Sequence, residues 1–144
     1  RIPPNRCYGS PMRKLTLLLT TLVFSLTMMF ASTSFAEWTG VSENVYGDTH
    51  YVDFERIRKH GGYVYFWYLE DFLKLDSGFL SSKNYHQIDC KLFRYKWLSS
   101  SFHKEPMGGG RPSTYSNTPD KDWRYPSPKS SNEEILKRVC AYAN

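Results

Sequence analysis

Residues that bind metals or carry catalysis are scarce in this sequence of 144 residues. It has three cysteines and four histidines, and none of these has the spacing of a zinc site or of a thiol–imidazole pair. A phosphate-binding loop is missing too, because Gly108–Gly110 is followed by Arg111 and not by Lys and a hydroxyl residue. No internal repeat is evident. These absences argue against an enzyme, and we expect no cofactor, no metal ion and no catalytic residue.

The sequence also lacks an apolar run that spans a bilayer comfortably, which takes about 20 residues. Its longest run, Leu15–Phe30, is interrupted by five Thr and Ser residues, follows a charged start, and precedes a stretch of small residues. This order predicts a signal peptide over residues 12–36, cleaved between Ala36 and Glu37. The alternatives are a retained membrane anchor and a buried core helix.

Residues 1–11 precede the first methionine, and we interpret them as a spurious upstream leader, so that the folded domain covers residues 37–144. The formal charge of the whole chain is +5, but four basic residues and no acidic ones lie before residue 37. Residues 37–144 contain 15 Lys and Arg and 14 Asp and Glu, and they have no polybasic run. We therefore expect no nucleic-acid partner, no membrane anchor after cleavage, and a periplasmic or secreted location.

Two cysteines remain in this domain, Cys90 and Cys140. A lone pair of cysteines in an exported chain is expected to be oxidised to a disulfide. Closing a loop of about 50 residues would stabilise the fold by about 4 kcal/mol in the chain-entropy model. The alternative is a catalytic thiol, which an oxidising compartment and a second cysteine both disfavour.

Aromatic and β-branched residues gather in short runs between turn residues, a pattern that favours antiparallel strands. The strongest run, Tyr63–Leu69, is apolar on both faces and is predicted to be a central strand covered on each side. Shorter strands are predicted over 38–41, 46–53 and 99–102. A single helical turn is predicted over 54–57, capped by the carboxylate of Asp53.

A second long run, Tyr85–Leu98, is predicted to be one strand region with Ile88, Cys90 and Leu92 on one face. Its other face carries Lys91, Phe93, Tyr95 and Trp97. That face is either part of the core or a platform on which single-stranded nucleic acid could stack. Export disfavours the second interpretation.

The C-terminal segment has a different, helical period. Ser131 as N-cap and Glu134 three residues later form a capping box, which predicts a helix over 132–142. Its apolar stripe consists of Ile135, Leu136, Val139, Cys140 and Ala143. Since both cysteines lie on apolar faces, the sequence predicts an α+β fold. In this fold an antiparallel β-sheet carries a C-terminal helix packed on one face and tied to it by the disulfide.

Two loops are the candidate binding sites, because binding groups concentrate in loops on a rigid scaffold. The first, Lys104–Arg111, has a basic residue at each end and is predicted to be flexible at Gly108, Gly109 and Gly110. The second, Leu75–Asn84, carries the apolar residues Phe79 and Leu80. The alternative is that both loops only connect strands.

Several short motifs follow one another along the domain. They are Trp38, Tyr51-Val52-Asp53, Trp67, Ser81-Ser82-Lys83, Asp89-Cys90, Gly108–Gly110, Trp123 and Val139-Cys140. In this order they resemble the bacterial surface-adhesin protein E-like domain family, from Trp38 to Ala141. The resemblance implies an antiparallel sheet joined to a C-terminal helix by Cys90–Cys140. It also implies binding to host extracellular-matrix or serum proteins, and a homodimer.

One departure from this family concerns anchoring. The adhesin that names the family is a lipoprotein, whereas the cleavage region Ser34–Glu37 has no cysteine to carry a lipid. Two functions therefore stay open. The domain is either an adhesin-like binding module for a host protein, or a soluble periplasmic structural or envelope-associated protein without a host ligand.

Overall fold

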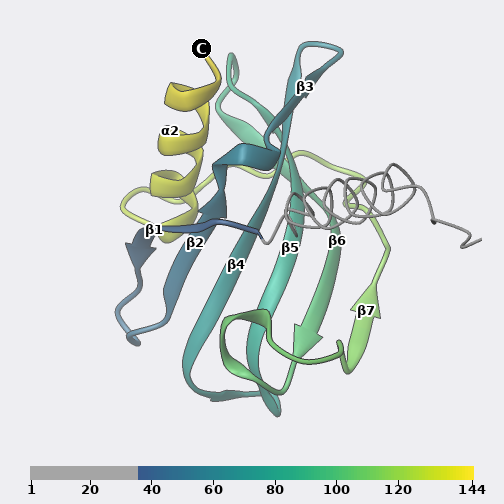
Figure 1. Cartoon of the computed structure of the whole chain (residues 1–144). Coiled ribbons are helices and arrows are strands. Elements are labelled where there is room, and N and C mark those ends of the chain that lie inside the picture. The colour runs from purple at the N-terminus through teal and green to yellow at the C-terminus, as the bar shows by residue number, and fades with distance from the viewer. Residues whose placement is uncertain (1–35) are drawn as a thin grey trace, which may run out of the picture. The chain divides into compact units, whose positions relative to one another are not determined.

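The structure is a computed structural model that describes residues 36–144 (Figure 1). The predicted signal peptide lies outside the described residues except for Ala36. In chain order the strands are β1 (Trp38–Glu43), β2 (Thr49–Asp53), β3 (Arg58–His60), β4 (Tyr63–Asp76), β5 (Phe79–Asp89), β6 (Arg94–His103) and β7 (Thr114–Ser116). Short 3-10 turns cover Phe54–Arg56 and Pro106–Gly108, and the helix α2 covers Ser131–Ala143.

All seven strands form one antiparallel sheet in the order β1-β2-β4-β5-β6-β7. β3 pairs with β4 next to β2, so that β2 and β3 share one side of the long strand β4. The turn from β3 into β4 is made by Gly61 and Gly62, whose φ angles of 59° and 82° suit glycine. Sequence neighbours pair in nearly every case, which is the pattern of successive hairpins.

The core lies between one face of the sheet and α2. Strands contribute Val52, Val64, Phe66 and Ile88, all at most 7% exposed, and the helix contributes Ile135, Leu136 and Val139, at most 1% exposed. Each of these side chains contributes roughly 1.5–3 kcal/mol through its burial. The predicted α+β fold with its helical stripe is therefore confirmed.

A disulfide between Cys90 and Cys140 joins the end of β5 to α2, as predicted. Both cysteines are partly buried against the core cluster. The bond closes a loop with a sequence separation of 50 and includes every strand from β6 onward. It therefore restricts the unfolded chain over more than a third of the domain.

The helix cap lies one residue before the predicted one. Ser130 is the N-cap, and its hydroxyl accepts a hydrogen bond from the backbone N–H of Glu133 at 3.2 Å. The Glu133 carboxylate in turn accepts the backbone N–H of Lys129 at 2.7 Å. Two adjacent serines and two adjacent glutamates allow the same capping box in either register, and this ambiguity explains the shift.

The prediction of one long strand over Tyr85–Leu98 is wrong, because the chain turns at Cys90–Phe93 between β5 and β6. The side chain of Asp89 stabilises this turn by accepting the backbone N–H groups of Lys91 and Leu92, each at 3.1 Å. Phe93 adopts a φ of 50°. Leu92 is 56% exposed and does not share the core face with Ile88.

The turn reverses the faces that were predicted for the aromatic residues of β6. Tyr95 pairs with Ile88 and Trp97 pairs with His86, so both aromatic side chains lie on the helix side of the sheet. They therefore do not form an exposed stacking platform. Asp53 also departs from its predicted role: its side chain makes no cap hydrogen bond and forms an ion pair with Arg56 at 3.2 Å.

A buried polar pair lies on the helix side of the sheet, where β2 meets β4. His50 Nε2 is 3.8 Å from Glu70 Oε1, and the two side chains are 7% and 24% exposed. Burial, reinforced by the charges of Asp48 and Asp76, raises the pKa of Glu70 to about 7. Burial lowers the pKa of His50. Near neutral pH His50 is therefore largely uncharged, whereas Glu70 is near the midpoint of its ionisation.

Removing the disulfide should lower the stability markedly. We expect the double variant Cys90→Ala and Cys140→Ala to lose roughly 2–5 kcal/mol of unfolding free energy, because its unfolded chain is no longer cross-linked. Urea unfolding measures this loss, and the wild type in reductant should match the variant. An unchanged midpoint in both samples would contradict the stabilising role of the bond.

The ionisation of Glu70 should make stability depend on pH. Its carboxyl keeps its proton up to about pH 7 in the folded state but only to about pH 4.5 in the unfolded state. The folded state binds more protons between these values, so stability falls as the pH rises through this window. The variant Glu70→Gln avoids this loss. We expect it to exceed the wild type by on the order of 1–3 kcal/mol at pH 8 and to gain much less near pH 4.5.

Urea unfolding at several pH values between 4.5 and 8 tests this expectation. Glu43→Gln, at the exposed end of β1, is the matched control and should track the wild type. A constant difference between Glu70→Gln and the wild type across the range would show that the ionisation of Glu70 is not involved.

Candidate binding surface

The side of the sheet that faces away from α2 carries a row of aromatic residues. Val64, Phe66 and Tyr68 point to the core, so the alternation of β4 places Tyr65 and Trp67 on this open face. Tyr85 pairs with Trp67 from β5, and their ring centroids are 4.8 Å apart in a stacked arrangement. Tyr65 also stacks on Tyr85 at 6.3 Å. The three rings are only half-buried, because no helix of the described residues covers them.

The prediction that Tyr63–Leu69 is covered on both sides is therefore only partly right: on the open face Leu69 is fully buried, but Tyr65 and Trp67 stay partly exposed. The sequence carries a signal for this difference. The core face of β4 begins with Val64 and Phe66, whereas the open face has Tyr63, Tyr65 and Trp67, which all carry a polar group at the end of an apolar ring. Such side chains suit a half-exposed surface.

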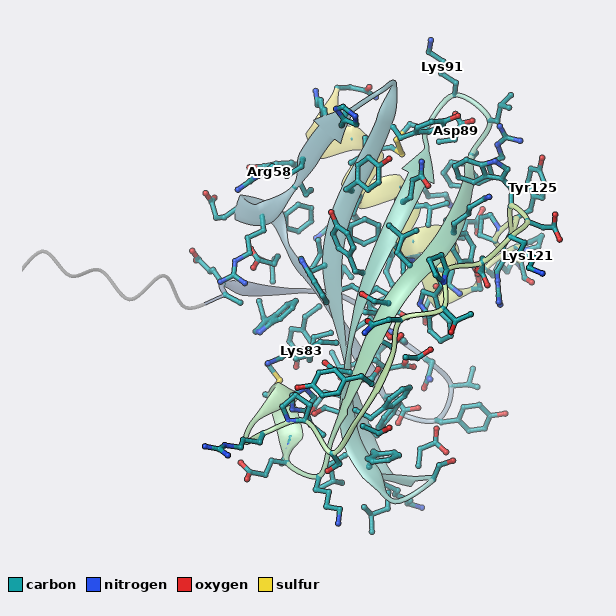
Figure 2. The ribbon with its side chains drawn as sticks, turned by 90° about the vertical axis from the view of Figure 1, so that its right-hand side faces the viewer. Arg58, Lys83, Asp89, Lys91, Lys121 and Tyr125 are labelled. Atoms are coloured by element: carbon teal, nitrogen blue, oxygen red, sulfur yellow. A yellow bond between two sulfur atoms is a disulfide. The ribbon has the colours of Figure 1, made fainter. Side chains whose placement is uncertain are left out.

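Basic side chains flank the aromatic row. Arg58 of β3 pairs with Tyr65, and Lys83 of β5 pairs with Leu69, so both lie on the open face. Figure 2 shows Arg58 and Lys83 projecting on the same side of the sheet. The guanidinium of Arg58 donates to the backbone oxygens of Glu55 and Ile57, at 3.2 and 2.9 Å. Among the described residues, no carboxylate forms an ion pair with Arg58 or Lys83.

A hollow of about 190 Å³ opens within this face. It is lined by Ala36, Trp38, Arg56, Trp67, Lys83 and Ser101. Arg56 and Lys83 both line this hollow, and burial, and to a smaller extent the charge of Arg56, lowers the pKa of Lys83. None of the described residues that line the hollow is acidic, although Arg56 reaches the buried Asp53 beneath. The hollow thus combines two tryptophan rings with two cations.

Such a surface is suited to protein recognition. Tryptophan, tyrosine and arginine dominate the binding energy of protein interfaces, because they bury a large area and lose little conformational freedom. Positive charge next to these rings favours a partner segment that is acidic. We call the set Trp38, Arg56, Arg58, Tyr65, Trp67, Lys83 and Tyr85 the open-face cluster.

The loop Lys104–Arg111 was predicted to be flexible, but hydrogen bonds anchor it to the sheet. Ser81 Oγ donates to the backbone oxygen of Glu105 at 2.6 Å and accepts the backbone N–H of Gly108 at 2.8 Å. Lys83 Nζ donates to the Gly108 oxygen at 2.8 Å. Lys104, Gly110 and Arg111 are exposed, Gly109 is partly exposed and Gly108 is buried. The loop therefore borders the open-face cluster at Lys83.

The second predicted loop, Leu75–Asn84, is in fact a tight hairpin. β4 ends at Asp76, only Ser77 and Gly78 form the turn, and β5 begins at Phe79. Phe79 packs against Phe102 of β6 with ring centroids 5.3 Å apart, and Leu80 is also partly buried. Phe79 and Leu80 are thus strand residues, and the structure does not bring them into the open-face cluster.

The part of the chain that the structure describes contains no helix that is both long and apolar enough to cross a membrane.

The fold and the surface described above define the class of protein: a small sheet-and-helix domain, closed by one disulfide, with an aromatic and cationic surface. The family model for surface-adhesin protein E matches residues 38–141. The chain belongs to the surface-adhesin protein E family.

Solved structures of Haemophilus influenzae protein E have the same fold. One crystal form is similar with a TM-score of 0.58 and 16% sequence identity, over 78% of this chain and 94% of that one. Another structure gives a TM-score of 0.54 at 16% identity, over 76% of this chain and 88% of the other. A structure from the non-typeable form gives 0.53 at 16% identity, over 76% and 79%. A search of curated proteins found no match.

Gly108 should tolerate a side chain less well than other glycines of similar conformation. Its φ is 67°, and an added Cβ would lie 2.1 Å from Lys83 Cε and 3.1 Å from Leu69 Cδ1. Gly61 has a φ of 59° but no atom within 4 Å of such a Cβ. We expect Gly108→Ala to lower the unfolding free energy by about 1 kcal/mol more than Gly61→Ala does. In Gly61→Ala only the positive φ is unfavourable, whereas Gly108→Ala adds a steric clash.

Urea unfolding of both variants measures this difference. Gly61→Ala is the internal control for positive φ, so only the contact with Lys83 and Leu69 separates the two. Equal losses would mean that the loop moves away from β5 without cost.

Proposed function

We propose that this protein is an exported, non-enzymatic binding domain that engages host extracellular-matrix or serum proteins. Membership of the surface-adhesin protein E family supports a role in binding at the cell exterior. The disulfide agrees with export, because such bonds persist in oxidising compartments. The periplasm or the medium is the proposed location, reached through cleavage between Ala36 and Glu37.

The observation that carries this proposal is the open-face cluster. An aromatic row that remains half-exposed on a rigid sheet, flanked by Arg58 and Lys83, has the composition of a recognition surface. The proposed partner segment is acidic, since its carboxylates would pair with these cations. The exposed Lys104 and Arg111 extend the proposed surface at the edge next to Lys83.

Binding of the purified protein to immobilised matrix and serum proteins, at physiological salt, tests the proposal. We expect at least one specific partner, whose affinity falls about tenfold or more for Trp67→Ala and for Arg58→Glu, and less for Lys104→Glu or Arg111→Glu. The binding should weaken as salt is raised, because the charges are exposed. Each variant should retain the far-ultraviolet spectrum and unfolding midpoint of a folded domain.

Two controls separate the surface from the rest of the molecule. Arg138→Glu reverses an exposed charge on α2 and should leave binding unchanged. The double variant Phe79→Ser and Leu80→Ser tests the β4–β5 hairpin and should also bind. If the wild type binds no protein of the panel, a periplasmic or envelope-associated role without a host ligand replaces the adhesin role.

A further inference from the structure

A small cavity lies on the opposite, helix-facing side of the sheet. It has a volume of about 110 Å³ and is lined by Tyr68, His86, Tyr95, Trp97, Arg124 and Asn132. These residues come from β4, β5, β6, the segment that follows β7, and the first turn of α2. The backbone of Arg124 exchanges two hydrogen bonds with Tyr95, each at 2.9 Å, which fixes this segment beside β6.

Two polar groups in this cavity are buried without a well-formed hydrogen bond. His86 is 2% exposed, and its Nε2 makes no hydrogen bond. The indole Nε1 of Trp97, which can only donate, interacts with the Tyr68 hydroxyl in the same cavity but forms no hydrogen bond of good geometry. A buried polar atom that stays unpaired costs about 1–3 kcal/mol, so an occupant of the cavity that completes these hydrogen bonds would be stabilised.

The ring of His86 is fixed by its aromatic neighbours. It packs edge-on against Tyr68, with centroids 4.8 Å apart, and stacks on Tyr95 at 5.4 Å and 10°. Burial lowers the pKa of His86 to about 3, despite the opposing effect of Asp120. The imidazole is therefore neutral and carries one ring N–H.

The rim of the cavity supplies a positive charge and further donors. Arg124 uses Nε and one terminal nitrogen to bind the Asp120 carboxylate, at 2.6 and 2.7 Å. A guanidinium has five N–H groups, so it can still donate to a second anion. Asn132 Nδ2 donates to the Tyr95 hydroxyl at 3.2 Å, which leaves the hydroxyl hydrogen available. The polar groups that line the cavity can thus donate hydrogen bonds, while the Asp120 carboxylate beside Arg124 offsets part of the charge at the rim.

We propose that this cavity binds the carboxylate of a small organic acid, with Trp97 Nε1 and His86 Nε2 as donors and Arg124 as the cation at the rim. A carboxylate has two oxygens that accept hydrogen bonds, one for Trp97 Nε1 and one for His86 in the tautomer that carries its proton on Nε2. The volume equals that of about three or four water molecules, which suits an acid with one to three carbons and excludes a sugar ring. The carboxylate could also come from the side chain of a partner protein.

Nuclear magnetic resonance of the ¹⁵N-labelled full chain tests this site. Its four tryptophans give four indole N–H signals, and Trp97→Phe identifies the one from Trp97. Acetate, propionate and pyruvate are titrated in turn, with acetamide as the uncharged isostere. We expect the acids to move the Trp97 signal saturably and acetamide to have far less effect, while the other three indoles serve as internal references.

Arg124→Gln should weaken acetate binding about tenfold, and Arg124→Lys, which keeps the charge, should weaken it less. Arg138→Gln on α2 is the matched control and should bind as the wild type does. Blocked aspartate, N-acetylated and amidated, then separates the two sources: its binding points to a partner's acidic side chain, whereas binding of the free acids alone points to a small metabolite.

Three results would overturn the proposal. These are a Trp97 signal that no acid moves at tens of millimolar, equal shifts with acetamide, and equal acetate affinity in Arg124→Gln. In each case ordered water is the occupant that satisfies His86 and Trp97.

Discussion

The packing of a single helix on one side of the sheet, locked by Cys90–Cys140, determines the rest of the structure. The helix supplies Ile135, Leu136 and Val139 as the only fully buried helical side chains of the described chain, and they can cover one face only. The disulfide adds to this packing by restricting the unfolded chain. On the other face the segment Glu105–Gly108 covers Leu69 and Ser81, while the aromatic residues Tyr65, Trp67 and Tyr85 stay half-exposed.

Local sequence signals were sufficient to predict the C-terminal helix and its attachment to the sheet by the disulfide. The spacing of Ile135, Leu136 and Val139 defines a helical face without any knowledge of the sheet, and the two cysteines of the domain leave one pairing. The position of the cap was less certain, because Ser130-Ser131 and Glu133-Glu134 satisfy the same motif in two registers. The structure has Ser130 in this role.

Turns and the exposure of strand faces could not be predicted in the same way. The run Tyr85–Leu98 contains no Gly or Pro, so nothing in its composition marks the reversal at Cys90–Phe93. The turn depends on Asp89, which accepts two backbone N–H groups and also pairs with Arg94 at 3.0 Å. Likewise, Tyr65 and Trp67 are half-exposed because no other element covers them, and the polar groups on their rings are the only sign of this in the sequence of the strand itself.

Net charge was also a poor guide to the binding surface, for a physical reason. The domain is almost neutral by count, yet three acidic residues on the open face are engaged within the fold. Asp53 is buried beside Arg56, Asp71 accepts the backbone N–H of Met107, and Asp89 holds its turn. Because these carboxylates are held by internal contacts, Arg58 and Lys83 give the face a positive character that the composition conceals. A surface of this kind attracts an acidic partner even though the domain as a whole carries little charge.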